Sequence, residues 1–274
     1  MKKYLKYGIM GILAATVSFL FLKQGKTEEE VTFRNYGQIL QSGVLRAVTE
    51  YNAFSFHAQE DTICGFHYEL LQAFARSKNL KLEVTPEMSL EKRQEGLNNG
   101  IYDILANNVL KTDRDEDTIL YTHPILLSKQ VLVQRNAQEK NDIHYIYSLL
   151  DLGQKTVYVV KNSPFIHRIR NLSNEIGDTI YIQEIDKYGP EQLVAMVANG
   201  DIDYAVCDES IVLASIKHFP QIDIKTAVSF TQFYSWGVNK NNTELLDSLN
   251  AWIYTFKQTP AFKELVEKYN NSKL

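Results

Sequence analysis

Apolar and polar residues along positions 43–270 follow two alternating periods, one typical of strands and one typical of helices. Short apolar runs predict strands at residues 44–48, 80–84, 102–106, 130–134, 156–160, 179–182 and 203–206. Apolar residues at helical spacing predict helices at 65–77, 90–98, 164–173, 190–198, 209–218, 243–256 and 260–269. Strands and helices that alternate in this way indicate the α/β class, with parallel-rich sheets flanked by helices.

Two segments of this pattern are near copies of each other, LNNGIYDILAN (residues 97–107) and VANGDIDYAVC (residues 197–207). Each combines a helix end, an Asn-Gly stop signal and a strand with an aspartate near its start. We therefore expect two lobes of similar construction, with a cleft at the carboxyl ends of their strands, where α/β proteins bind ligands.

The N-terminus has the composition of an export signal. Three lysines precede an uncharged apolar run at residues 8–22, and Lys23 follows it. The run is shorter than the roughly 20 residues that span a bilayer, but no small-residue cleavage motif comes after it. We expect residues 1–23 to be either a cleaved signal peptide or a retained membrane anchor, and residues 24–37 to be a polar tether. The remainder would then be periplasmic, soluble or tethered to the cytoplasmic membrane.

Composition and motifs argue against nucleic-acid binding, metal binding and catalysis. A net charge of -4 provides no basic surface for nucleic acid. The six histidines are scattered singly, without the spacing of metal ligands, and no phosphate-binding loop or hydrolase motif occurs. We expect no metal, no cofactor and no catalysis. Cys64 and Cys207 would lie in different lobes, where a disulfide would prevent the cleft from opening, so we expect free thiols.

Six segments in the expected order resemble the family 3 extracellular solute-binding proteins. They include ILQSGVLRAVTEYNAFSF (39–56), GFHYELLQAFA (65–75), LGQKTVYVVKNSPF (152–165) and TPAFKELVEKY (259–269). The resemblance covers residues 38–270. Within the family, KQVLVQR (129–135) is similar to the receptor half of membrane-bound lytic transglycosylase F, without the lysozyme-like catalytic domain of those proteins.

The resemblance implies a type II periplasmic-binding-protein fold with two crossover hinge strands, at residues 130–135 and about 228–233. Lobe 1 would comprise residues 38–130 plus 232–274, and lobe 2 residues 131–231. The implied function is a monomeric extracytoplasmic receptor that closes on a small ligand for uptake by an ABC-type permease. The alternative is a muropeptide-sensing regulatory module that acts on a separate cell-wall enzyme.

The family's ligand set is carried over by position. An arginine fork suits a ligand carboxylate, a strand-end carboxylate suits an ammonium group, and aromatic faces add contact area and cation attraction. The matching positions are Arg114 for the carboxylate, Asp208 for the ammonium, Glu50, Tyr51 and Phe54 in the aromatic loop, and Ser163 for a hydroxyl contact.

Each position also has a structural interpretation. Asp208 and Ser163 could cap helices, Tyr51 and Phe54 could be packing residues, and Arg114 lies in the charge run KTDRDED. Asn107 and Asn108 stand where the family usually has Gly and Thr. The ligand is therefore left open as an amino acid, a peptide or a cell-wall fragment.

Overall fold

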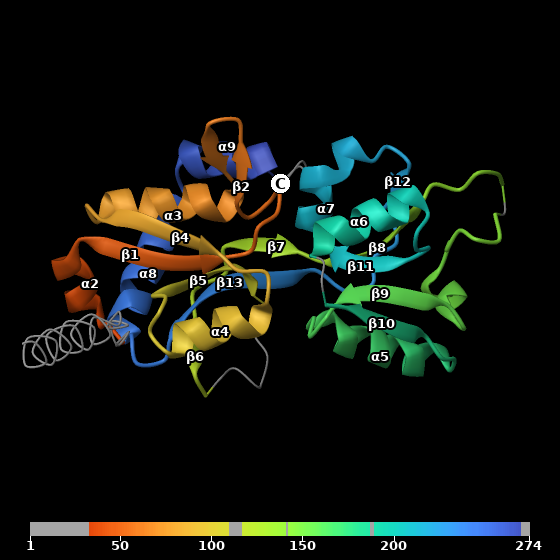
Figure 1. Cartoon of the computed structure of the whole chain (residues 1–274), viewed down its shortest axis with the longest axis horizontal. Helices are drawn as coiled ribbons and strands as arrows, with labels where there is room; N and C mark the ends of the chain where they lie inside the picture. The colour runs from red at the N-terminus through yellow and green to blue at the C-terminus, as the bar shows by residue number, and fades with distance from the viewer. Residues whose placement is uncertain (1–32, 110–116, 141, 187–188, 270–274) are drawn as a thin grey trace, which may run out of the picture. The chain divides into compact units, whose positions relative to one another are not determined.

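The computed structural model describes residues 33–109, 117–140, 142–186 and 189–269, which form two mixed sheets with helices against them (Figure 1). The first sheet has the strand order β4-β1-β5-β13-β6, and β7 also pairs with β13. Its strands are β1 (Val44–Thr49), β4 (Lys81–Pro86), β5 (Ile104–Val109), β6 (Ile119–Tyr121), β7 (Leu126–Ser128) and β13 (Gln232–Asn239). The α/β class is confirmed.

The second sheet has the order β10-β9-β11-β8-β12. Its strands are β8 (Gln130–Arg135), β9 (Thr156–Val160), β10 (Tyr181–Ile185), β11 (Ala205–Asp208) and β12 (Ile222–Asp223). A separate hairpin pairs β2 (His57–Gln59) with β3 (Thr62–Cys64).

Apart from α2, which was not predicted, the helices are close to those predicted from helical spacing. They are α2 (Tyr36–Ser42), α3 (Phe66–Ser77), α4 (Leu90–Asn98), α5 (Phe165–Ile176), α6 (Pro190–Asn199), α7 (Glu209–Ser215), α8 (Thr243–Phe256) and α9 (Pro260–Tyr269). The predicted helix at 209–218 is α7 followed by a short 3-10 turn, η2 (Ile216–His218); a second such turn is η1 (Leu149–Leu152).

Each sheet combines parallel strands with one strand that arrives from the other half of the chain. In the first sheet β1 runs parallel to β4 and β5, and β13 runs antiparallel to β5. In the second sheet β9 runs parallel to β10 and β11, and β8 runs antiparallel to β11. The chain thus enters the second sheet through β8 and returns to the first through β13, which confirms the two crossover strands.

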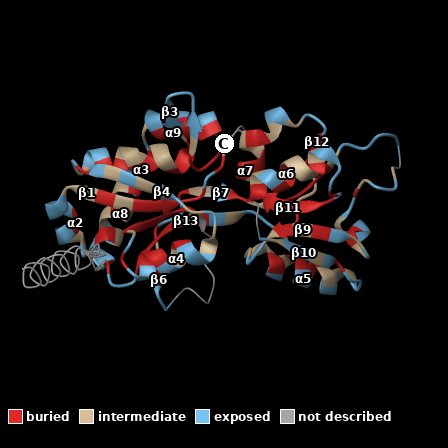
Figure 2. Cartoon of the chain, viewed as in Figure 1, coloured by how far each residue is buried: buried red, intermediate tan, exposed pale blue. Residues whose placement is uncertain are grey.

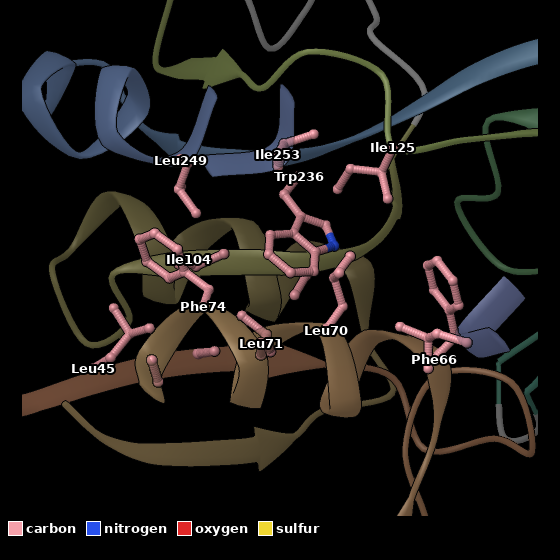
Figure 3. Close-up of a cluster of buried hydrophobic side chains, with 14 of the residues drawn as sticks. Leu45, Phe66, Leu70, Leu71, Phe74, Ile104, Ile125, Trp236, Leu249 and Ile253 are labelled. Atoms are coloured by element: carbon pink, nitrogen blue, oxygen red, sulfur yellow. The ribbon is translucent and has the colours of Figure 1, made fainter. Parts of the chain in front are cut away.

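Both faces of each sheet carry a hydrophobic core, visible as buried strands in Figure 2. Helices α3, α8 and α9 cover the face of the first sheet that carries the larger hydrophobic core. There Trp236 is fully buried among Phe74, Leu71 and Leu249 (Figure 3). The Trp236 Nε1 donates a hydrogen bond of 3.0 Å to Nδ1 of buried His67, so the indole N–H is satisfied.

The near-copy segments share a contact as well as a sequence. Arg46 on β1 donates to the carboxylate of Asp103 and to the carbonyl of Gly100. Arg135 on β8 donates to the carboxylate of Asp203 and to the carbonyl of Val197. In both halves an arginine from the neighbouring strand therefore holds the turn between a helix and the following strand, which explains the repeated aspartate.

At the N-terminal side, α2 begins at Tyr36, within the segment expected to be a tether. A capping box joins Asn35 and Gln38, a local helix-start signal. The predicted signal or anchor, residues 1–23, lies outside the described residues. Among the helices that the structure describes, none is long and apolar enough to cross a membrane.

The two cysteines are free thiols. Cys207 is fully buried on β11, and burial raises the pKa of its thiol strongly, so the reactive thiolate is suppressed. Cys64, at the end of β3, is partly exposed.

Candidate functional site

A cavity of about 510 Å³ lies between the carboxyl ends of strands from the two sheets. From the first half it is lined by the ends of β1 and β5 and by the β4–α4 connection, residues 87–94. From the second half it is lined by the β9–α5 turn, residues 160–165, and by the ends of β10 and β11. The position is the one expected for a ligand site in parallel α/β sheets, and the volume is typical of a small-molecule pocket.

Asp208 lies on the wall of this cavity, at the last residue of β11, and is 2% exposed. It is also the N-cap of α7, because its Oδ1 accepts from the backbone N–H of Ser210 at 3.0 Å. The same oxygen accepts from Ser128 Oγ, at the end of β7, at 3.0 Å. Asp208 therefore combines the capping interpretation with a place on the cavity wall.

Burial raises the pKa of Asp208 above its ordinary value, because the charged form loses water. Hydrogen bonds from Ser210 and Ser128, together with the nearby hydroxyl of Tyr234, offset part of this increase, since they favour the carboxylate. Tyr234 belongs to β13 and Ser128 to β7, so Asp208 interacts with both segments through which the chain passes between the sheets. A cationic group placed beside Asp208 would lower its pKa and stabilise the ionised form.

Glu50 directly follows β1 and is the second buried carboxylate of the cavity, 8% exposed. Its Oε2 accepts from Asn52 Nδ2 at 3.1 Å, and its Oε1 lies 3.8 Å from Arg93 Nη1. Burial raises the pKa of Glu50, and the negative charge of Asp208 adds to the increase, whereas Arg93 lowers it. The two carboxylates are thus close enough to interact although they come from different sheets.

Arg93 on α4 is a buried cation that lines the cavity, and it was missing from the residues predicted by sequence. Its Nη1 donates to the backbone carbonyls of Glu87, at 2.5 Å, and Met88, at 3.1 Å. A signal for its burial was present, because Leu90, Arg93 and Leu97 share one face of the helix by their spacing. An arginine on an apolar helix face between two leucines indicates a buried, functional or structural charge.

Asn107 on β5 is 8% exposed and lines the cavity. Its Oδ1 is buried and accepts no hydrogen bond from the described residues. Buried polar atoms are normally paired, so this acceptor is available to a donor that enters the cavity.

Ser163 lines the opposite wall in the β9–α5 turn, and its Oγ accepts from the N–H of Phe165 at 3.3 Å. This turn brings the N-terminus of α5 to the cavity. Helix N-termini favour negative groups, because unpaired N–H groups and the helix dipole point toward them. The N-cap residue of α5 is Pro164, so Ser163 is not the predicted cap, but its side chain braces the first turn and lies on the wall.

The two aromatic residues predicted to contact the ligand, Tyr51 and Phe54, have different surroundings in the structure. Phe54 is 1% exposed and packs in the core, with its ring stacked on Phe66 at a centroid distance of 5.1 Å. Tyr51 is exposed and lies against the edge of Phe56. Neither residue is among those that line the cavity. The Oδ1 of Asn52 accepts from the N–H groups of Phe54 and Ser55, and this turn directs Phe54 inward.

The remaining predicted contacts cannot be placed on the wall. Arg114 lies outside the described residues. Asn108 belongs to β5, but its side chain is not among those described. Their ligand contacts stay predictions.

The two buried carboxylates predict a specific pH dependence. Their pKa values are raised in the folded state, so the folded protein binds more protons at these groups than the unfolded chain. Their contribution to stability is full below the unfolded pKa values of about 4 and is lost as the pH rises through the raised folded values. We expect the variant carrying Glu50→Gln and Asp208→Asn to gain stability relative to the wild type as the pH rises.

Denaturant unfolding of both proteins, from about pH 4.5 to 8, measures this difference. The comparison cancels titrating groups that do not interact with the two carboxylates. The groups that face the carboxylates are Arg93, Asn52 and Glu191 around Glu50, and Ser128, Ser210 and Tyr234 around Asp208. A stability difference that does not change with pH would contradict the prediction.

A match to the family described as bacterial extracellular solute-binding proteins, family 3, extends over residues 45–272. The chain belongs to this family. The resemblance on which the sequence analysis rested is thus confirmed, and with it a ligand-binding fold of the kind that the cavity indicates.

Relatives of this family 3 chain include the membrane-bound lytic murein transglycosylases F. The protein from Desulfosudis oleivorans is 28% identical over 235 residues, 85% of this chain and 50% of that protein. The protein from Photobacterium profundum is 28% identical over 256 residues, 91% of this chain and 48% of that protein. The chain spans about half the length of the curated relatives it matches.

Solved structures of similar fold include an ancestral arginine-binding protein bound to arginine, with a TM-score of 0.71 and 23% identity over 83% of this chain and 98% of that one. Another is the amino acid ABC transporter substrate-binding protein AbpA from Streptococcus pneumoniae, bound to L-arginine, with a TM-score of 0.70 and 21% identity over 84% of this chain and 96% of that one. The type II fold predicted for this family 3 protein is confirmed.

Proposed function

We propose that this family 3 protein is a receptor for a small solute that carries an amino group, and that it closes on the solute by hinge motion. The observation that carries the proposal is the cavity between the two sheets, where Glu50 from the first half and Asp208 from the second half present carboxylates, and where the N-terminus of α5 opens from the second half. A site for a zwitterion needs a negative group beside the ligand's ammonium and a positive group beside its carboxylate.

In this proposal the chain binds and releases the solute unchanged, as a monomer, and delivers it to an ABC-type permease. The place of action is the periplasmic side of the cytoplasmic membrane, with the protein either soluble or tethered by its N-terminal segment. The family's description as extracellular and the lysine-flanked apolar run at residues 8–22 support this location. Arg114 and Asn108 are proposed as further ligand contacts on the first half.

A second candidate is a muropeptide-sensing module that acts on a separate cell-wall enzyme. The relatives described as murein transglycosylases support it, since the chain matches about half of each. A cavity of about 510 Å³ leaves room for a short peptide as well as an amino acid.

A thermal-shift screen of the full chain tests both candidates. The panel contains the twenty amino acids, short peptides and purified muropeptides. A ligand at about 100 times its Kd is expected to stabilise the fold by about 2.7 kcal/mol, which raises the Tm of a chain of this size by about 5–10 °C. A shift with free amino acids supports the transport receptor, and a shift with muropeptides alone supports the sensor. No shift with any member would contradict both.

A further inference from the structure

The charge of Glu50 is not matched by a close ion pair among the described residues. Its Oε1 is 3.8 Å from Arg93 Nη1, a long contact, and the Nη1 of Arg93 already donates to two backbone carbonyls. Among the residues that the structure describes, the neutral amide of Asn52 donates a hydrogen bond to Glu50. Two charges held apart in a buried site interact less favourably than a bidentate pair, so Glu50 retains capacity for a further cation.

The described residues on the cavity wall carry an excess of negative charge. Lys161 is paired with Asp186 at 2.8 Å near the rim, so it does not neutralise the buried carboxylates. The carboxylates of the wall are five, against three cations: Glu50, Glu87, Glu91, Asp186 and Asp208, against Lys92, Arg93 and Lys161. Of these charges, Glu50, Asp208 and Arg93 are buried, two negative and one positive. Buried charge of one sign is costly unless it is compensated, and a positively charged occupant would compensate the excess.

Asn107 is an independent indication that the occupant of the cavity is positively charged. It is more than nine-tenths buried, lines the cavity, and its Oδ1 has no hydrogen-bond donor among the described residues. An occupant rich in N–H groups would satisfy this oxygen. Ammonium and guanidinium groups carry several donors and no acceptor, which fits a wall that presents the oxygens of Asn107, Glu50 and Asp208.

We infer that Glu50 is a second anionic contact of the binding site, and that the solute is a net cation whose positive charge faces both Glu50 and Asp208. The inference rests on the proposed function and names the chemical class of its ligand. A neutral zwitterion has one ammonium group and one carboxylate, and would place a positive group beside only one of the two buried carboxylates. A solute with a second ammonium or guanidinium group would match both.

Three pairs of probes that differ in one positive charge test this inference: L-arginine and L-citrulline, L-lysine and Nε-acetyl-L-lysine, and the dipeptides lysyl-alanine and Nε-acetyl-lysyl-alanine. Affinities are measured by calorimetry on the full chain. Within each pair that binds, we expect the cationic member to bind about 10- to 100-fold more tightly, since hydrogen bonds to charged groups have this strength. Glu50→Gln is expected to remove most of this preference.

The matched control is Glu95→Gln, an exposed residue of α4 that does not line the cavity, which changes the net charge equally and is expected to keep the preference. Glu50→Asp, which retains the charge, is expected to retain part of the preference. If neutral probes or neutral amino acids bind as well as the cationic ones, or if Glu50→Gln keeps the preference, the inference is wrong while the proposed receptor function stands. If nothing in the wider solute panel binds either, both are wrong.

Discussion

Asp208→Asn is expected to weaken solute binding by about 30-fold or more, because removing one side of a buried charge pair costs about 2–5 kcal/mol. Asparagine is the informative replacement because it keeps an acceptor oxygen for Ser128 and for the N–H of Ser210. Alanine would leave those donors unsatisfied in a buried place, at a cost of about 1–3 kcal/mol, and would mix a stability effect with a binding effect.

Calorimetry with the solute found by the thermal screen measures the affinity, and denaturant unfolding confirms that the fold persists. Asp201→Asn is the matched control, since Asp201 is exposed in the turn just before β11 and lies away from the cavity lining. An Asp208→Asn protein that is folded and binds with wild-type affinity would show that this carboxylate only caps α7 and braces the strands around it.

Phe54→Ala is expected to lower the free energy of unfolding by about 3–5 kcal/mol, the usual cost of removing a buried phenylalanine. The ring of Phe54 stacks on Phe66 and meets the edges of His67 and Tyr269, all inside the core of the first sheet. Tyr51→Ala, three residues away and exposed, is expected to change the free energy of unfolding by less than about 0.5 kcal/mol.

Chemical denaturation of the two variants measures these changes. Phe54→Leu fills most of the space and is expected to remain folded with near wild-type solute affinity, because the ring is buried in the core and does not line the cavity. A folded Phe54→Leu protein with strongly reduced affinity would instead assign the ring to the site, as the family resemblance suggested.

The elements that the sequence predicted well are those whose pattern is local. Helices α4, α8 and α9 have the expected bounds, because their apolar residues recur at helical spacing and their ends carry stop or start signals. The strands β6, β7 and β12 and the hairpin of β2 and β3 were not predicted. Each has only two or three residues, too few for a period to be recognised.

The candidate site was predicted in part. Asp208 could be placed because an apolar strand ends there and a helix begins, and strand ends of α/β sheets meet at one edge. Glu50, Asn107 and Ser163 were carried over from the family resemblance, and they line the cavity. Arg93 was not predicted because the strand-end rule does not apply to residues within a helix, and Arg93 lies on α4. Its spacing from Leu97 nevertheless indicated that it is buried.

By itself the sequence determined the order and type of the main elements, the two similar halves and the family. These depend on periodicity and on short signals between neighbours along the chain. Only the tertiary structure decided that Phe54 faces the core while Tyr51 faces solvent, because an Asn52 turn sets their directions. It also decided that Glu50 and Asp208, far apart in sequence, share one cavity. Burial and like charge raise the pKa of Glu50 only after the crossing of β8 and β13 brings the two sheets together.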